Sequence, residues 1–305
     1  MDSNFVEFGD CRKIMQGWKK EGIKAQTCVT SPPYYGLRDY GTDGQIGLEQ
    51  TLAEYVKAMV EVFSCVWDVL EDDGTLWLNL GDSYAGSNGN GQHEQTLGQS
   101  KYVPFTSPTR GNKSGVKAKN LLGVPWKVAF ALQDAGWILR QDIIWHKPNP
   151  MPESVRDRCT KSHEYIFLFS KKAKYYFDNE AIKEKAVTAP AKRNKAGEGY
   201  QADYTNGARF SDGERIYGAD GLRNKRDVWT VNLKPYKGAH FATFPPPLIE
   251  PCVLAGSRVN DIVLDPFMGS GTTAMVAKQH GRRYIGCELN ETYGDLQDER
   301  IRSVV

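Results

Sequence analysis

The stretch Asp261–Glu288, DIVLDPFMGSGTTAMVAKQHGRRYIGCE, decides the fold of this chain. The apolar run at its start predicts a short buried strand, and Gly269 and Gly271 predict a tight turn that opens a helix. A second apolar run follows and predicts another strand, which ends at Glu288. Strand, glycine turn, helix and strand in this order are typical of a βαβ unit and therefore indicate a parallel sheet.

The turn of this unit indicates a site for a nucleoside cofactor. Gly269 and Gly271 allow the backbone to approach a ligand closely, and Glu288 can accept hydrogen bonds from both ribose hydroxyls. The lysine of a phosphate-binding loop is missing, and Asp265 would repel a pyrophosphate while attracting a cation. The sulfonium cofactor S-adenosylmethionine matches this pattern better than a nucleoside triphosphate does. The alternative is a glycine turn that serves packing only.

Hydrophobic periodicity along the whole chain predicts alternating strands and helices. The expected strands are 5–8, a short one ending near 29, 75–80, 137–145, 163–170 and 283–288, and the expected helices are 52–70, 124–132, one reaching 254, 274–280 and 291–302. This alternation predicts an α/β fold with a doubly wound, mostly parallel sheet.

Three details of this prediction concern element ends. Asp10 follows the first strand, where it is either a ligand-binding group or the N-cap of a helix that starts near Cys11. Asp73-Gly74 is expected to end the helix 52–70. The segment 175–177 is expected to pair back on the strand 163–170 as a hairpin.

A second unusual stretch is Ser31-Pro32-Pro33-Tyr34, inside the run TCVTSPPYYGLRDYG at 27–41. Two consecutive prolines allow neither a helix nor continued strand pairing, and their rings hold the Pro32 carbonyl stiffly. A rigid carbonyl, a hydroxyl and an aromatic ring at a strand end suit a flat ligand that carries an NH₂ group. The alternative is a stiff turn capped by core tyrosines.

Two polar segments indicate contact with a polyanion. Between 85 and 119 glycine and polar residues dominate, and 101–119 contains basic residues but no acidic one. Between 178 and 226 basic residues alternate with aromatic ones, a pattern that fits nucleic-acid contact. The expected contacts are Lys101, Arg110, Lys113, Lys117, Lys119, Arg193 and Arg223. The alternative for both segments is a solvated loop without a partner.

Composition excludes several other classes. Hydrophobic content of 40% and a net charge of +2 are ordinary for a globular domain, and no apolar run approaches the length of a membrane span. The N-terminus lacks the apolar core of a signal peptide, so a cytoplasmic protein is expected. The six cysteines form no C-x-x-C pair, so neither a disulfide framework nor a metal site is expected.

With both motifs in view, the chain resembles the DNA amino-methyltransferases, which methylate the exocyclic amino nitrogen of cytosine or adenine. TSPPY at 30–34 is similar to the catalytic motif of that family, DPFMGSGTT at 265–273 to its cofactor loop, and HFATFPPPL at 240–248 to the segment before that loop. The catalytic motif comes first and the cofactor loop last, which is the circularly permuted, beta-group order.

The resemblance implies a Rossmann-like fold of S-adenosylmethionine-dependent methyltransferases. Residues 1–177 would form its catalytic part, with a flexible basic loop at 85–119, and 227–305 its cofactor-binding part. The range 178–226 would be an inserted target-recognition region. Bacteria, archaea and phages are the expected sources, and double-stranded DNA is the expected partner. A homodimer and a cognate restriction endonuclease remain open.

The resemblance also assigns roles to single residues. The implied catalytic residues are Ser31, Pro32, Pro33 and Tyr34, and the implied cofactor-binding residues are Asp10, Thr30, Asp265, Pro266, Phe267, Gly269, Ser270, Gly271, Thr272 and Glu288. Ser31 and the Pro32 carbonyl would bind the target NH₂ group, and Tyr34 would stack on the flipped base. In this family serine at the first motif position goes mostly with N4 of cytosine, so Ser31 favours cytosine over N6 of adenine. More distant alternatives are an RNA or protein-glutamine methyltransferase and a nucleic-acid-binding module without activity.

Overall fold

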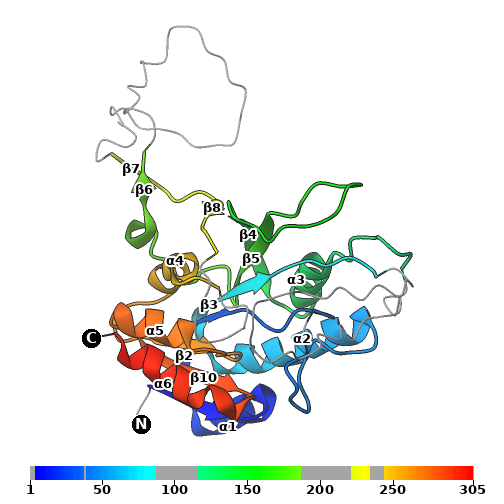
Figure 1. Ribbon diagram of the computed structural model, residues 1–305. Coiled ribbons are helices and arrows are strands. Elements are labelled where there is room, and N and C mark those ends of the chain that lie inside the picture. The colour runs from blue at the N-terminus through cyan, green and yellow to red at the C-terminus, as the bar shows by residue number, and fades with distance from the viewer. Residues whose placement is uncertain (1–3, 38, 87–115, 187–220, 234–243, 305) are drawn as a thin grey trace, which may run out of the picture.

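The computed structural model describes residues 4–37, 39–86, 116–186, 221–233 and 244–304 (Figure 1). In chain order the elements of these residues are β1 (Asn4–Phe8), α1 (Cys11–Glu21), β2 (Ala25–Thr30), α2 (Leu52–Val69), β3 (Leu70–Leu80), α3 (Val124–Asp134), β4 (Ile138–His146), β5 (His163–Ser170), η1 (Glu180–Ile182), β6 (Glu184–Lys185), β7 (Leu222–Arg223), β8 (Val228–Thr230), α4 (Pro246–Gly256), β9 (Ile262–Asp265), α5 (Thr272–Gln279), β10 (Arg283–Glu288), η2 (Glu291–Tyr293) and α6 (Gly294–Arg302).

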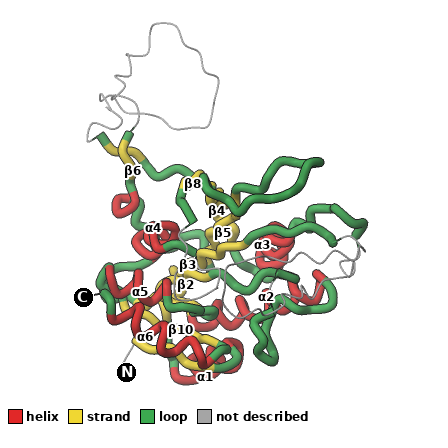
Figure 2. Tube along the Cα trace, viewed as in Figure 1, coloured by secondary structure: helices red, strands yellow, loops and turns green. Residues whose placement is uncertain are grey.

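The centre of the molecule is an eight-stranded sheet in the order β1-β10-β9-β2-β3-β5-β4-β8. All neighbouring strands are parallel except β5, which is antiparallel to both β3 and β4. Helices cover both faces of the sheet (Figure 2). The predicted doubly wound, mostly parallel α/β fold is therefore confirmed, and its Rossmann-like character with it.

Two separate apolar cores fill the space between the sheet and its helices. On one face, α1, α2 and α3 pack together and enclose a core that contains Trp18, Phe63 and Phe167. On the other face, α4, α5 and α6 enclose a core that contains Trp77, Leu248 and Val276. Because both faces are covered, β2 is buried at every position, as expected for a central strand.

The strands β2 and β9 are neighbours although they are far apart in the sequence. Thr27 pairs with Val263, and Cys28 pairs with Leu264, in a parallel register. The chain runs outward from this pair in both directions, through α2 to β3 and through α5 to β10. This is the switch point of the sheet, outside which α/β proteins bind their ligands at the carboxyl ends of the strands.

Several helix ends are held by polar side chains, and the N-cap predicted at Asp10 is among them. Thr51 and Glu54 form a complete capping box at the start of α2. Asp10 caps α1 by accepting the backbone N–H of Arg12 at 2.9 Å. The start of α3 is capped from outside the helix, because the Asp82 carboxylate accepts the N–H groups of Gly123 and Val124.

The expected end of the first long helix at Asp73-Gly74 is wrong. The helix α2 ends at Val69, and β3 begins at the next residue. Asp73 and Gly74 lie inside β3 at an irregularity of the pairing with β2. A Cβ atom at position 74 would lie 2.9 Å from two backbone oxygens, so glycine is needed there for close strand contact rather than for a helix stop.

The expected hairpin at 175–177 is also wrong. Both edges of β5 are already occupied, by β3 and by β4, so no edge is left for another strand. The segment instead runs alongside β3, where the N–H of Tyr176 donates to the Asp73 carbonyl at 2.9 Å.

The described ends of the range 178–226 stand apart from the central sheet. They form η1 and a two-stranded ribbon of β6 and β7, which projects away from the main body (Figure 1). Within the described residues, no helix has the length and apolar character needed to cross a membrane.

Candidate active site

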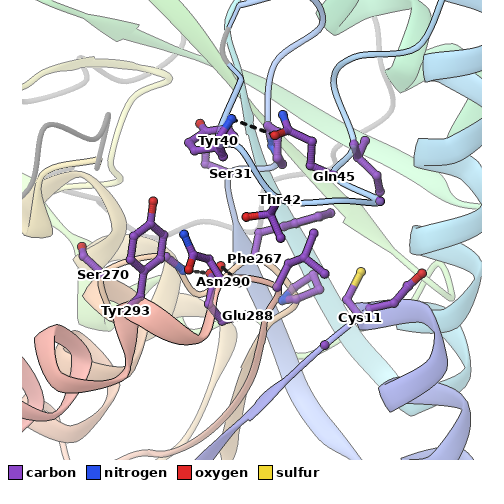
Figure 3. A pocket seen from close by; sticks show the side chains of 18 of the residues that line it. Cys11, Ser31, Tyr40, Thr42, Gln45, Phe267, Ser270, Glu288, Asn290 and Tyr293 are labelled. Carbon is purple, nitrogen blue, oxygen red and sulfur yellow. Dashed lines mark hydrogen bonds between the residues drawn. The ribbon is translucent and has the colours of Figure 1, made fainter. Parts of the chain in front are cut away.

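A cavity lies outside the carboxyl ends of β1, β2, β9 and β10, at the switch point of the sheet (Figure 3). The residues that line it come from five segments of the chain. They are Gly9, Asp10, Cys11, Arg12, Ser31, Pro33, Tyr40, Thr42, Gly44, Gln45, Ile46, Pro266, Phe267, Gly269, Ser270, Glu288, Leu289, Asn290, Tyr293 and Leu296. The structure thus brings Ser31 and the glycine turn, which are more than 230 residues apart, to one cavity.

Glu288 forms one wall of this cavity together with the glycine turn. Its Oε2 accepts the N–H of Gly269 at 2.7 Å, and its Oε1 accepts the N–H of Asn290 at 2.9 Å. Burial raises the pKa of Glu288 above its usual value, although these hydrogen bonds favour the charged form. Each oxygen keeps a second lone pair, so a ligand hydroxyl can still bind.

The glycine turn itself is held from behind by α6. Gln297 donates to the Gly269 carbonyl at 2.7 Å, and Arg300 donates to the Ser270 hydroxyl at 2.6 Å. Gly271 starts α5 with a φ of 79°, a left-handed conformation that favours glycine. The turn is therefore fixed in position by the last helix of the described chain.

Asp265 and Thr30 lie behind the wall of the cavity and do not line it. The Asp265 carboxylate accepts the hydroxyls of Thr30 and Thr273, each at 2.6 Å, and the N–H of Phe267 at 2.9 Å. Burial raises the pKa of Asp265 to about 6 despite these three donors. This network joins β2, β9 and α5 directly beneath the cavity. Gly271 and Thr272 do not line the cavity either.

Asp10 reaches the cavity and is also an N-cap, so the two interpretations of this residue are compatible. Its carboxylate accepts the Arg12 guanidinium at 2.8 and 3.0 Å, and this contact lowers the pKa of Asp10. Next to it, burial raises the pKa of the Cys11 thiol to about 12. The thiol therefore stays protonated and is no nucleophile at neutral pH.

A glycine-rich loop, 36–47, covers the cavity from the side of β2, and the sequence patterns did not predict that it takes part in the site. Its ends meet where the N–H of Gly36 donates to the Gly47 carbonyl at 2.8 Å. Within it, the Gln45 side chain accepts the N–H of Tyr40 at 2.7 Å. Figure 3 shows Tyr40, Thr42 and Gln45 across the cavity from Glu288, Asn290 and Tyr293. The dense glycines after a strand end are the signal that could have indicated a ligand-covering loop.

The Ser-Pro-Pro-Tyr corner borders the same cavity. Ser31 and Pro33 line it, whereas Pro32 is buried and lies outside the lining. The Pro33 carbonyl accepts the Tyr55 hydroxyl at 2.9 Å, which anchors the corner to α2. Proline rings and this anchor fix the corner before any ligand binds.

Tyr34 points away from the cavity lining into a polar cluster. Its hydroxyl donates to Glu164 Oε2 at 2.8 Å and lies 3.2 Å from Asn79 Oδ1 and 3.4 Å from the Ser31 hydroxyl. Lys147 forms a largely buried ion pair with Glu164. The sequence patterns identified neither Glu164 nor Lys147. Glu164 lies near the start of β5, which joins β3 only through the tertiary fold, and Lys147 directly follows β4, which pairs with β5.

Gly81, at the end of β3, makes room for Tyr34. A Cβ atom at position 81 would lie 2.6 Å from the Tyr34 ring and 3.3 Å from the Glu164 carboxyl carbon. The close approach of ring and backbone therefore requires glycine.

Three of the residues expected to contact DNA belong to the described chain. Lys117 and Lys119 are exposed, and Lys119 pairs with Asp157 at 2.6 Å. Arg223 in β7 pairs with Glu184 at 2.9 Å. Lys101, Arg110, Lys113 and Arg193 lie outside the described residues, as does part of the stretch 240–248.

The chemistry of the lining residues fits S-adenosylmethionine. Carboxylates at Asp10 and Glu288 suit hydroxyl or amino donors, and Phe267, Ile46 and Leu289 suit the flat face of an adenine. Among the described lining residues Arg12 is the basic one, and it is bound to Asp10, so none of these residues is arranged to neutralise a triphosphate.

Comparison with known proteins agrees with this site. The family model of the DNA methylases of N6/N4 type matches residues 25–299. The type II methyltransferase M.SmaI of Serratia marcescens is 47% identical over 96% of this chain and 89% of its own length. M.Cfr9I of Citrobacter freundii, also a type II methyltransferase, is 44% identical over 96% of this chain and 86% of its own length.

Solved structures share the fold at lower identity. The PvuII DNA methyltransferase matches with a TM-score of 0.62 and 18% identity, covering 98% of this chain and 87% of that one. A putative DNA modification methylase of Thermus thermophilus, solved with S-adenosylmethionine, matches with a TM-score of 0.61 and 22% identity, covering 99% and 94%. The chain belongs to the DNA methylases of the N4-cytosine/N6-adenine type, the amino-methyltransferases whose methyl donor is S-adenosylmethionine.

Proposed function

We propose that this protein methylates N4 of cytosine in double-stranded DNA. The observation that carries the proposal is Ser31, which lines the cavity at the first position of a Ser-Pro-Pro-Tyr corner. A serine hydroxyl can accept one N–H of the target amine and donate its own proton to Tyr34. N6 of adenine is the alternative target. Adenine can also be methylated at such a corner, since it presents an edge similar to that of cytosine.

The residues of the site would act mainly by alignment. The sulfonium supplies an activated methyl group, so the protein has to hold a weak nucleophile in line with it. Ser31 and the Pro32 carbonyl would accept the two N–H bonds of the amine, which raises the electron density on nitrogen. Phe267 and Ile46 line the cavity and would keep bulk water away from the bound cofactor.

Residues behind the cavity wall would position those that touch ligands. In this proposal Thr30, Asp265, Gly271 and Thr272 hold the corner and the turn in register, while Asp10, Phe267, Gly269, Ser270 and Glu288 contact the cofactor. Glu288 would bind the ribose hydroxyls, and Tyr34 would stack on the extruded base at about 1–3 kcal/mol.

The DNA-binding surface would combine both polar segments. Residues 178–226 would form the target-recognition region between the catalytic part, 1–177, and the cofactor-binding part, 227–305. The segment 85–119 would contact phosphates. The relatives are type II methyltransferases, which supports a cytoplasmic modification enzyme that works beside a restriction endonuclease of the same specificity.

The test is nucleoside analysis of methylated DNA. Purified protein is incubated with unmethylated DNA and S-adenosylmethionine, and the DNA is digested and measured by mass spectrometry. We expect N4-methyldeoxycytidine, and N6-methyldeoxyadenosine alone would overturn the choice of base. Ser31→Ala should lose transfer, whereas the matched control Ser64→Ala, on the exposed face of α2, should keep it.

A further inference from the structure

The loop 147–162, between β4 and β5, lies beside the proposed catalytic corner. β4 runs in the same direction as β2, because β3 is parallel to β2 and β5 is antiparallel to both β3 and β4. The loop therefore leaves the sheet at the same edge as Ser31, and it projects away from the main body (Figure 1). At its base, Lys147 pairs with Glu164, which accepts the Tyr34 hydroxyl.

The loop is stiff although its outer part is exposed. Pro148, Pro150 and Pro152 restrict its backbone in the ascending half. Asn149 exchanges two hydrogen bonds with the backbone of Leu233, at 2.9 and 3.0 Å. In the descending half, Glu153 accepts the Arg158 guanidinium at 2.7 Å and the N–H of Lys161 at 3.1 Å.

The loop is also fastened to the segment next to α3. The Arg158 guanidinium lies 4.1 Å from the centre of the Tyr84 ring, and Lys119 pairs with Asp157. Lys161 donates to the Asp82 carbonyl. These contacts hold the loop at both of its sides and leave its apolar Met151 exposed.

In the exposed part of this loop, Met151 is 71% exposed, more than any other large apolar side chain of the described residues. Val155 and Arg156, further along the same loop, are exposed as well. A stiff loop beside a catalytic corner that exposes both an apolar and a basic side chain suits a partner with phosphates outside and flat apolar surfaces inside. Double-stranded DNA has this chemistry.

We infer that Met151 enters the DNA duplex at the position that the target base leaves, while Arg156 contacts the neighbouring phosphates. This inference rests on the proposed function. Extruding a base costs unpairing and unstacking and leaves a gap between the flanking bases. An unbranched, adaptable side chain such as methionine can fill this gap and slow the return of the base. Because the loop is preformed, little ordering is needed on binding.

The test compares two duplexes of the sequence that the protein methylates, which is first identified by sequencing DNA from a host that expresses it. In one duplex the target base is paired, and in the other it faces an abasic site, so extrusion is easier. We expect Met151→Ala to lower kcat/KM about tenfold on the paired duplex and less than about twofold on the other. Met151→Leu should restore most of the rate.

The control is Val259→Ala, which shortens a 60% exposed apolar side chain just before β9, at the opposite edge of the sheet. It should change neither rate, and all variants should unfold at the same urea concentration. Equal rates of Met151→Ala and the unaltered protein on the paired duplex would overturn the inference, as would an equal loss on both duplexes. No transfer by the unaltered protein to either duplex would overturn the proposed function as well.

Discussion

At the residue scale, Asp265 shows how the site is held together from behind. This residue is only 1% exposed, and its carboxylate binds Thr30, Thr273 and the backbone of Phe267. It thereby connects the strand before the Ser-Pro-Pro-Tyr corner with the strand before the glycine turn. The charge of Asp265 is costly in this position, because burial raises its pKa from 3.8 to about 6.

This shift predicts a pH dependence of stability that Asp265→Asn removes. Between pH 3.8 and about 6 the folded protein holds the Asp265 proton more tightly than the unfolded chain does. The free energy of unfolding therefore falls as the pH rises through this range, by about 3 kcal/mol from this group. Urea unfolding is measured at pH 4, 5, 6 and 7. The free energy of unfolding of the Asp265→Asn variant, relative to that of the unaltered protein, should increase as the pH rises. A difference that stays constant with pH would contradict the prediction.

Glu164 is a second residue whose role depends on its contacts. Since its carboxylate accepts the Tyr34 hydroxyl, Glu164 should act on methyl transfer by positioning the Tyr34 ring. Hydrogen bonds to charged groups contribute about 1.5–3 kcal/mol. We expect Tyr34→Phe and Glu164→Ala each to lower kcat/KM.

The double variant that combines Tyr34→Phe with Glu164→Ala tests whether Glu164 acts by positioning Tyr34 or acts independently of it. If Glu164 acts through the Tyr34 hydroxyl, the double variant should lose no more activity than the more damaging single variant. The matched control is Glu71→Ala. Glu71 is an exposed acid near the start of β3, at the opposite end of that strand from Tyr34. Fully additive losses would show that Glu164 works independently of Tyr34.

At the element scale, the carboxyl end of β3 determines where the catalytic corner can lie. β3 pairs with β2 on one side and with β5 on the other, so Tyr34 and Glu164 approach its end from opposite sides. Gly81 provides the space in which these two side chains meet. Pairing of β3 with its two neighbours therefore sets which residues lie side by side at this end of the sheet. Gly81 is the position there at which any side chain would clash.

Gly81→Ala should separate methyl transfer from cofactor binding. The added Cβ atom would lie 2.6 Å from the Tyr34 ring, which has to move, whereas neither residue lines the cofactor cavity. We expect methyl transfer to fall at least about tenfold, with cofactor affinity in calorimetry unchanged within about twofold. The control Gly17→Ala, in α1, adds a Cβ atom with nothing within 4 Å and should keep full activity. An active Gly81→Ala variant would refute the steric argument.

At the scale of the whole molecule, the cofactor cavity joins the two ends of the described chain. Asp10 reaches it from the N-cap of α1, Ser31 from the end of β2, and Glu288 from the end of β10. A ligand that binds all three segments binds only the folded chain. Its binding free energy is therefore added to the free energy of unfolding of the whole sheet.

S-adenosylmethionine at 100 times its dissociation constant should raise the free energy of unfolding by about 2.7 kcal/mol. Thermal unfolding at rising ligand concentration checks this, and the transition should shift as one step. Glu288→Gln should reduce the shift because it replaces a hydroxyl-accepting oxygen by an amide NH₂. ATP should stabilise little, since Arg12 is engaged with Asp10. A shift by ATP equal to that by S-adenosylmethionine would contradict this assignment of the cavity.

The sequence by itself determined the fold class, the order of the motifs and most of the elements. These properties depend on contiguous residues: a periodicity of two or 3.6, a glycine turn after an apolar run, or a proline pair at a strand end. The same reasoning failed at Asp73-Gly74 and at 175–177. There the outcome depended on which strand edges were already paired, and local turn signals do not contain that information.

Only the tertiary structure decided which distant side chains meet. It placed Thr30 against Asp265, Tyr34 against Glu164, and the loop 36–47 over the cavity. It also showed Asp10 to be both a helix cap and a lining residue of the cavity. Contacts between segments more than 100 residues apart follow from the order of strands in the sheet. That order minimises the free energy of the whole chain, so no local stretch of sequence specifies it.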